Sequence, residues 1–286
     1  MDDPLCALEA GGAAESRHAM RCTSLLFHDV VPGGRWQSSG FAGADADAYK
    51  MDSEEFRGHL KAVAHGLRRT VSTAGEVLSN TTASDPLLFT FDDGGASALH
   101  TADLLDEFGW KGHFFITAGR IGTPGFLDSS QIQELHRRGH IIGSHSYTHP
   151  LRMALCSPAQ LDDEWQRSGT VLSDILGESI RVASVPGGLY SRAVASSAAK
   201  SGIRVLFNSE PVTQSHMVEG CLVLGRFSIM RGHSPGRSAA LVDGNRQLLI
   251  REYLFWNAKK LGKMVLGSAW LKARVVLMER RARKEQ

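Results

Sequence analysis

The sequence predicts an α/β fold built on a mostly parallel sheet or barrel. Short apolar runs alternate with amphipathic segments of ten or more residues, which is the pattern of βαβ units. The chain has 286 residues, of which 42% are hydrophobic and 22% charged, ordinary values for a globular protein with a substantial core. In such folds, binding and catalytic sites lie where the strands end.

The expected strands are short apolar runs followed by polar or glycine-rich residues. They span residues 23–29, 87–93, 112–118, 140–145, 181–186 and 203–209, and residues 221–229 supply one or two more. Between the first two strands, residues 30–50 have the Gly, Pro and Ser content of a long loop. A loop of this length in a compact domain is more often functional than idle.

The expected helices carry apolar residues at helical spacing and begin near capping residues. They span residues 54–69, 96–109, 129–139, 157–177 and 191–202. Asp52 or Ser53 can cap the first helix, and Ser129 or Ser130 the third. Ser157 can cap the fourth, with Pro158 at its first position.

Composition divides the chain into three parts. Residues 1–22 are rich in Ala, Gly and acidic residues and are expected to be poorly ordered, and residues 23–245 form the α/β domain. Residues 246–286 hold eleven Lys/Arg and three Asp/Glu, a net of +8, so the remainder of a chain of net charge +2 carries −6. We interpret this part as a basic amphipathic helical extension.

Cysteine usage and the N-terminal residues favour a cytoplasmic location. The four cysteines form no C-x-x-C pair, and a domain of this size does not need disulfides to fold. The sequence shows neither a secretory signal nor an apolar run of the ~20 residues that cross a bilayer.

Polar residues recur at the ends of the predicted strands. His28 and Asp29 end the first strand, Asp92 and Asp93 end the second, and His145 ends a later one. Because these ends meet at one rim of a parallel sheet, we expect the side chains to converge there. This recurrence is the main argument from the residues alone for an active site.

The segment "HSYTH" places His145 and His149 four residues apart, on one side of the chain if the segment turns helically. Imidazole binds zinc and similar ions, and a carboxylate is the natural third ligand. Two histidines and one aspartate leave coordination open for water, as in catalytic metal sites. The alternative is that His145 caps the sheet and His149 is a surface residue.

The stretch "TFDDGG" then gives the two aspartates different uses. At a strand end both can reach one cavity, so one carboxylate can bind a metal while the other accepts a proton from water. Gly94 and Gly95 allow a tight turn directly afterwards. A turn in which one aspartate caps the next helix explains one of them but not both.

"TFDDG" followed by "HSYTH" resembles the polysaccharide deacetylase, or NodB-homology, family, and the resemblance extends from about residue 23 to about residue 229. The opening "HDV" is most similar to the exopolysaccharide-associated type. The resemblance implies a distorted (β/α)7-type barrel. It implies that Asp92 is the general base and that Asp93, His145 and His149 bind the metal, Zn²⁺ or another divalent ion such as Co²⁺, Ni²⁺ or Fe²⁺.

The sequence departs from this family in its third motif, which usually carries an arginine that steadies the base, then prolines and an aromatic residue. The equivalent stretch, residues 183–191 ("ASVPGGLYS"), keeps Pro186 and Tyr190 but has no arginine. Arg226, on another strand, can supply the missing charge and is also a candidate substrate contact. Arg181 is a second candidate, although it lies at the opposite end of its strand.

Pro186, Gly187, Gly188 and Tyr190 are predicted to bind substrate, because Pro-Gly-Gly suits the lip of a groove where backbone approaches a ligand. A plain turn explains the same three residues equally well. Three aromatic residues in or beside the long loop are further candidates for contact with a sugar: Trp36, Phe41 and Tyr49.

The acid that protonates the leaving group is also not where the family usually has it. A late Leu-x-His motif is not evident, and His233 lies in a Gly/Pro loop. We predict His28 as the acid because it lies at the rim that carries the aspartates. The alternative is a buried histidine that orients Asp29.

We therefore expect a hydrolase of carbon–nitrogen bonds other than peptide bonds, which removes N-acetyl or O-acetyl groups from a carbohydrate by metal-activated water attack. A sugar- or metal-binding barrel without turnover and a hydrolase of a non-sugar amide are the alternatives. No nucleic-acid recognition motif is present. The basic extension can contact the inner face of a membrane and a lipid-linked sugar, or it can pack on the barrel with a solvated basic face.

Overall fold

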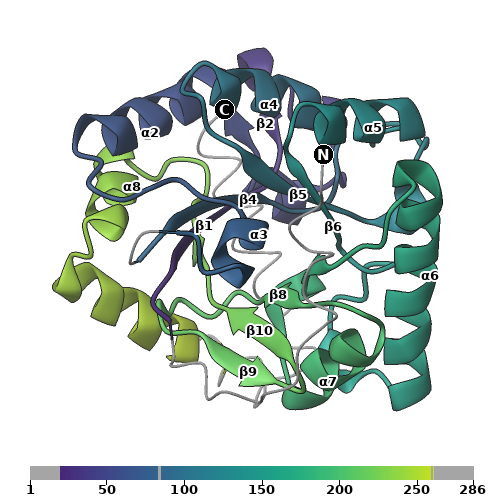
Figure 1. Cartoon of the computed structure of the whole chain (residues 1–286). Coiled ribbons are helices and arrows are strands. Elements are labelled where there is room, and N and C mark those ends of the chain that lie inside the picture. The colour runs from purple at the N-terminus through teal and green to yellow at the C-terminus, as the bar shows by residue number, and fades with distance from the viewer. Residues whose placement is uncertain (1–19, 83–84, 259, 261–286) are drawn as a thin grey trace.

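The computed structural model describes residues 20–82, 85–258 and 260, which form a curled sheet surrounded by helices (Figure 1). Nine strands make up this sheet, in the order β11-β1-β4-β5-β6-β7-β8-β10-β9. All the pairings are parallel except that of β9 with β10. The expected disorder of residues 1–22 falls largely on residues outside those described. In the C-terminal extension, residues 246–258 are helical, and residues 259 and 261–286 lie outside the described part.

Every predicted strand is present in the sheet. Its strands are β1 (Thr23–Phe27), β4 (Leu87–Phe91), β5 (Gly112–Ile116), β6 (Ile141–Ser144), β7 (Val182–Ser184), β8 (Val205–Phe207), β9 (His216–Val218), β10 (Cys221–Leu224) and β11 (Phe227–Ser228). A separate parallel pair, β2 (Val30–Val31) and β3 (Met51–Asp52), joins the two ends of the long loop. The sequence analysis did not predict β2, β3 or β9.

The five predicted helices are also present, three others accompany them, and residues 246–258 are helical as well. The helices are α1 (Ala44–Asp47), α2 (Ser53–His65), α3 (Ala74–Leu78), α4 (Ala98–Asp106), α5 (Ser129–Arg137), α6 (Pro158–Leu176), α7 (Arg192–Lys200) and α8 (Pro235–Val242). Asp52 and Ser157 cap α2 and α6 as predicted, but Asp128 rather than Ser129 or Ser130 caps α5. In the described part of the chain, no helix has the length and hydropathy to cross a membrane.

The sheet curls until its two ends approach each other. The chain leaves β10 near one end of the strand order and enters β11 at the other end after only Gly225 and Arg226. The result is a parallel half-barrel with a short seam, as the predicted distorted barrel requires. Figure 1 shows helices around the outside of this sheet, with α3 inside the ring.

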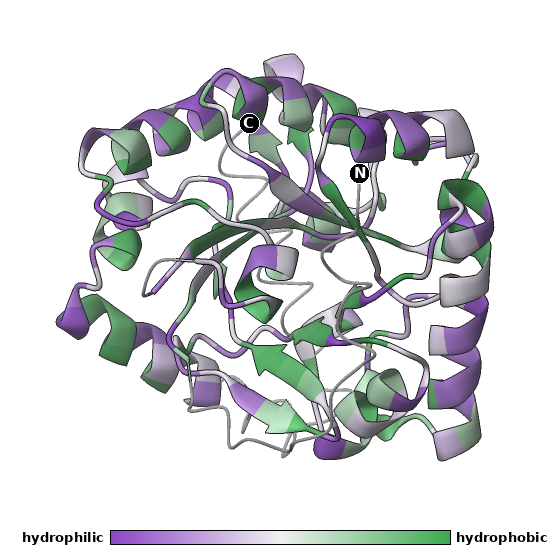
Figure 2. Ribbon diagram, viewed as in Figure 1, coloured by the Kyte–Doolittle hydropathy of each residue, from purple (hydrophilic) through white to green (hydrophobic). Residues whose placement is uncertain are grey.

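Each strand presents alternate side chains to two apolar layers. Phe89 and Phe91 of β4 pack with the outer helices, whereas Leu88 faces the inside of the barrel with Phe115, Phe207 and residues of α3. Figure 2 shows the corresponding pattern, with hydrophobic strands inside and helices whose outer faces are hydrophilic. The inner layer supports the polar groups that lie above it at the strand ends.

Candidate active site

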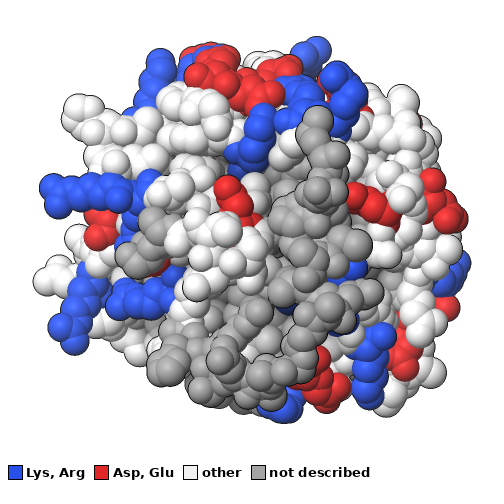
Figure 3. Space-filling model, viewed as in Figure 1, with Lys and Arg blue, Asp and Glu red and all other residues white. Residues whose placement is uncertain are grey.

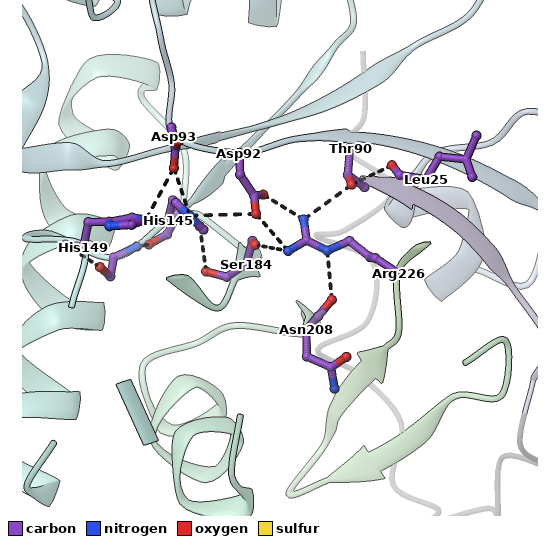
Figure 4. A network of polar contacts seen from close by, with 11 residues as sticks. Leu25, Thr90, Asp92, Asp93, His145, His149, Ser184, Asn208 and Arg226 are labelled. Atoms are coloured by element: carbon purple, nitrogen blue, oxygen red, sulfur yellow. Dashed lines mark hydrogen bonds and ion pairs between the residues drawn. The ribbon is translucent and has the colours of Figure 1, made fainter. Parts of the chain in front are cut away.

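Asp93, His145 and His149 form a compact cluster at the strand ends (Figure 4). One ligand atom from each lies within 4.8 Å of the other two. Asp93 Oδ1 is 3.5 Å from His145 Nε2 and 3.4 Å from His149 Nε2. Two imidazole nitrogens and one carboxylate oxygen are a donor set for zinc and related divalent ions, so these residues fit the metal that the family resemblance implies.

The hydrogen bonds of His145 orient its ring for this purpose. Its Nδ1–H donates to the carbonyl oxygen of Ser184 at 3.1 Å, which leaves the Nε2 lone pair directed at the cluster. Such an outer hydrogen bond commonly fixes the tautomer of metal-ligating histidines. Burial lowers the pKa of His145, but the charges of Asp92 and Asp93 raise it overall, so the site favours positive charge.

The carboxylate of Asp93 is held ionised. Burial alone would raise its pKa, but hydrogen bonds from His145 and His149 hold the pKa well below its ordinary value. Its backbone has a φ of +80°, and Gly94 follows at +77°. A Cβ on Gly94 would lie 3.1 Å from the Cα of Ile116, so glycine is required for the tight turn that aims Asp93 inward.

The segment from His145 to His149 is not helical, so that part of the sequence interpretation was wrong. Ser146 and His149 instead have φ values of +62° and +63°. A non-glycine residue in this region costs on the order of 1–3 kcal/mol. The Ser146 hydroxyl accepts a hydrogen bond from the His149 backbone N–H at 3.1 Å, which stabilises the turn that brings the two rings together.

Asp92 lies beside this cluster and is paired with Arg226 (Figure 4). The guanidinium donates from Nη1 to Asp92 Oδ1 at 2.7 Å and from Nη2 to Oδ2 at 2.9 Å. Burial raises the pKa of a carboxyl, but Arg226 outweighs it and holds the pKa of Asp92 below its ordinary value. Asp92 Oδ2 is also 3.8 Å from His145 Nε2, so the carboxylate faces the proposed metal position.

Arg226 is fixed on every side. Its other donors reach the Asn208 carbonyl at 2.9 Å, the Ser184 hydroxyl at 2.7 Å and the Thr90 hydroxyl at 3.4 Å. Beneath it, the rings of Phe115 and Phe207 lie 5.8 and 5.9 Å from the guanidinium carbon. The barrel seam therefore supplies the charge that the third motif lacks.

This placement corrects one prediction. The Arg226 side chain has no exposed surface, so it stands behind the base and cannot bind substrate. Pro186 is likewise buried, in a short 3-10 turn (Pro186–Gly188), and is not a contact surface. Gly187, at a φ of +65°, lies against the backbone of Leu151, where a Cβ would be 2.2 Å from the carbonyl oxygen. The Pro-Gly-Gly turn thus packs on the loop after His149.

Gly187, which is exposed, remains a candidate substrate contact together with Gly188 and Tyr190. Gly188 lies near Ser209, and both Gly188 and Tyr190 are only partly buried. The Tyr190 hydroxyl lies 3.2 Å from His216 Nε2, and burial raises the pKa of Tyr190 to about 12. Tyr190 therefore stays neutral and offers a hydrogen-bonding group.

His28 lies near the aspartates, as its position after β1 predicts. Burial lowers its pKa although Asp93 and Asp92 act in the opposite direction, so the ring is neutral at pH 7. Within the described residues, its Nδ1 has no hydrogen-bond partner. Asp29 is oriented instead by the hydroxyls of Ser39 at 2.5 Å and Ser97 at 2.9 Å. The alternative in which His28 orients Asp29 is therefore wrong.

The three aromatic residues of the long loop each contact another side chain. Phe41 lies 4.8 Å from the ring of His149, and Tyr49 lies 4.7 Å from the ring of His28. Trp36 is instead covered by Arg231, 4.6 Å from its ring. Phe41 and Tyr49 thus border the candidate site, whereas Trp36 packs against Arg231.

Comparisons with known proteins connect this geometry to a family. Residues 79–206, which include both the paired aspartates and the paired histidines, match the family model described as polysaccharide deacetylase. Residues 79–206 thus match the polysaccharide deacetylase family. The resemblance seen in the sequence is confirmed. The family supports carbohydrate deacetylation and makes the protein a hydrolase of carbon–nitrogen bonds other than peptide bonds.

Individual relatives agree with this assignment. YxkH of Bacillus subtilis, whose name places it among the polysaccharide deacetylases, is 25% identical over 224 residues, 77% of this chain and 75% of YxkH. A chitin deacetylase of Arthroderma benhamiae is 37% identical over 79 residues, which cover 26% of this chain but only 20% of that protein. The crystal structure of BC0361, a polysaccharide deacetylase from Bacillus cereus, has a TM-score of 0.63 at 17% identity and covers 78% of this chain and 69% of that one. The last similarity establishes the fold.

Proposed function

We propose that this deacetylase is metal-dependent and removes N-acetyl, or O-acetyl, groups from a carbohydrate. The observation that carries the proposal is the convergence of Asp93, His145 and His149 beside an Asp92 that is held ionised. These three residues would hold Zn²⁺ or another divalent ion such as Co²⁺, Ni²⁺ or Fe²⁺. When bound, such an ion polarises the acetyl carbonyl and lowers the pKa of water.

Asp92 is the proposed general base. Its carboxylate takes a proton from the water that attacks the acetyl carbon, and Arg226 holds both of its oxygens in place during that transfer. Because Arg226 also lowers the pKa of Asp92, the base is ready in its ionised form at neutral pH. The guanidinium thus stabilises the reactive form and limits the rotation of the carboxylate.

His28 is the proposed acid that protonates the leaving nitrogen, but its buried ring must first gain a proton. Because its pKa is lowered, its ring is neutral when the reaction begins. It can therefore protonate the leaving group only after it has gained a proton during turnover. Asp92 holds one once water has attacked, so the two residues together can move this proton from the water to the nitrogen.

The substrate is proposed to approach from the surface. The cavity bordered by His28, Asp29 and Asp92 has a volume of about 10 Å³, room for about one water molecule. This cavity is not bordered by Asp93, His145 or His149, so the proposed approach from the surface rests on the aromatic side chain beside His149. Phe41, which is only partly buried and borders His149, is a candidate surface for a sugar face.

The alternative of a binding barrel without turnover depended on the missing third-motif arginine and the missing late histidine. Arg226 provides the missing charge beside Asp92, which removes the first ground, and His28 is proposed for the role of the missing histidine. The experiment that tests the proposed function is acetate release from N-acetylated oligosaccharides by protein stripped of metal and then reloaded. Activity that falls on stripping and returns with Zn²⁺ or Co²⁺ supports it, and full activity without metal contradicts it.

Contact with an anionic membrane is a further part of the proposal. Four apolar side chains are about half exposed or more in the described part of the extension: Ile250, Tyr253, Leu254 and Phe255. Figure 3 shows basic side chains along the edge that holds α8 and the residues after it. With the net charge of +8 on residues 246–286, this supports contact with anionic lipids and a lipid-linked substrate. Sedimentation with anionic but not neutral vesicles tests it.

The location proposed for this contact is the cytoplasmic side of the membrane. Cys22, Cys156 and Cys221 are free thiols, which supports a reducing compartment. The inner leaflet also carries the anionic lipids that a basic segment binds. Fractionation of cells that contain the full chain tests the location, and recovery of the protein outside the cell would contradict it.

A further inference from the structure

A buried carboxylate from α6 contacts the loop that carries both histidines. Glu164 is 7% exposed, and its Oε2 accepts hydrogen bonds from the backbone N–H groups of Tyr147 and Thr148, both at 2.8 Å. Its Oε1 accepts a third hydrogen bond from the Thr148 hydroxyl. One side chain therefore binds the two residues midway between His145 and His149.

The rest of the loop is held from the opposite side. The carbonyl oxygen of Ser146 accepts from the N–H of Ala118 at 3.1 Å, and that of Tyr147 accepts from the N–H of Gly119 at 2.9 Å. These bonds fix the carbonyl edge of the loop to the residues after β5. Glu164 fixes the N–H edge, so the segment is clamped between two elements.

The charge of Glu164 points to a specific purpose. Among the described residues, no Lys, Arg or His lies within ion-pair distance of its carboxylate, so its charge is met by N–H and O–H dipoles alone. Two successive backbone N–H groups that converge on one anion form a small binding nest. A buried carboxylate with only these partners can be explained by its hold on the loop.

We propose that Glu164 is a positioning residue of the metal centre. It holds residues 145–149 in the irregular conformation that directs Nε2 of His145 and His149 toward Asp93, and in this way it sets the affinity for metal. The inference rests on the proposed metal site. Groups outside the ligand shell typically change metal affinity 10- to 100-fold through the orientation of the ligands.

The test measures Zn²⁺ affinity by competition with a chromophoric chelator. Glu164→Leu removes all three acceptors at similar volume, and Glu164→Asp withdraws the carboxylate by one methylene. We expect both to weaken Zn²⁺ binding by at least about tenfold. Glu164→Gln should stay within about threefold, because its oxygen can accept both N–H groups and its amide can donate to the Thr148 hydroxyl.

Asp163→Asn is the matched control, since Asp163 is an exposed neighbour on the same helix whose partner is Arg167. Urea unfolding of each metal-free variant checks that it is folded. If Glu164→Leu is not folded, the Zn²⁺ affinity of Glu164→Asp decides the test. If the folded Glu164→Leu and Glu164→Asp variants bind Zn²⁺ as tightly as the wild type, the inference is overturned. If the wild type itself binds no Zn²⁺, or His149→Ala binds it as tightly, the proposed metal site fails instead.

Discussion

Replacing Arg226 with methionine should leave the Asp92 carboxylate buried and without its partner. Asp92 is 6% exposed, and the two guanidinium bonds at 2.7 and 2.9 Å are its ion pair. Removing one member of a buried pair costs about 3–5 kcal/mol, because the remaining charge is left uncompensated. We expect Arg226→Met to lower the free energy of unfolding of the metal-free protein by this amount, as measured by urea denaturation.

A double-mutant cycle separates this effect from simple loss of packing. Asp92→Asn in the Arg226→Met background removes the unpaired charge, so the double variant should be more stable than Arg226→Met alone, with a coupling of about 2–3 kcal/mol. Arg204→Met is the control, because Arg204 donates to a backbone carbonyl and should cost about 1 kcal/mol or less. Additive effects of Asp92→Asn and Arg226→Met would refute the reasoning.

Activity gives a second measurement on the same variants. A base displaced by about 1 Å can lose about 100-fold in rate, so Arg226→Met should lower turnover by that order at unchanged metal content. Arg226→Lys keeps the positive charge but cannot donate to both Asp92 oxygens. Its turnover should therefore lie between that of the wild type and that of Arg226→Met. Wild-type turnover in a folded Arg226→Met would show that Asp92 needs no partner.

Two further predictions concern the residues around the base. Burial raises the pKa of Asp29 to about 6, whereas in the unfolded state the group has its ordinary pKa of 3.8. Between these two pH values the folded state binds a proton that the unfolded state has released. The contribution of Asp29 to the free energy of unfolding therefore falls as the pH rises from about 4 to 6. Asp29→Asn should remove about 3 kcal/mol of that pH dependence in urea unfolding, and an unchanged pH profile would contradict this. His28→Ala should lower turnover by 10²–10⁴-fold with metal content unchanged, and equal turnover would move the acid role to another residue.

The sequence predicted most of the fold because its signals are local. Every strand of the sheet except β9 follows from an apolar run, and the capping pattern at Ser157 correctly starts α6. The inner helix α3, which was not predicted, also has a local signal in the capping box of Thr73 and Glu76. Glycine at position 95 was predicted for a turn, but it is required because a Cβ there would lie 1.9 Å from an Asp29 carboxylate oxygen.

Only the site residues that stand in the two short sequence motifs could be predicted. Asp92, Asp93, His145 and His149 stand in two short motifs, so their convergence could be predicted from the strand order. The distances in sequence between Arg226 and Asp92, 134 residues, and between Glu164 and Tyr147, 17 residues, leave no comparable local pattern. Arg226 was suggested only because a charge was missing, and its burial was visible only once the sheet had curled.

The central claim is that Asp93 binds the metal while Asp92 acts as the general base. One comparison of variants tests it most directly. Asp92→Asn and His149→Ala are loaded with Zn²⁺, and bound metal and acetate release are measured on the same samples. We predict that Asp92→Asn retains metal but loses turnover, whereas His149→Ala loses both. Full activity of Asp92→Asn, or loss of its metal together with retention of metal by His149→Ala, would contradict the account.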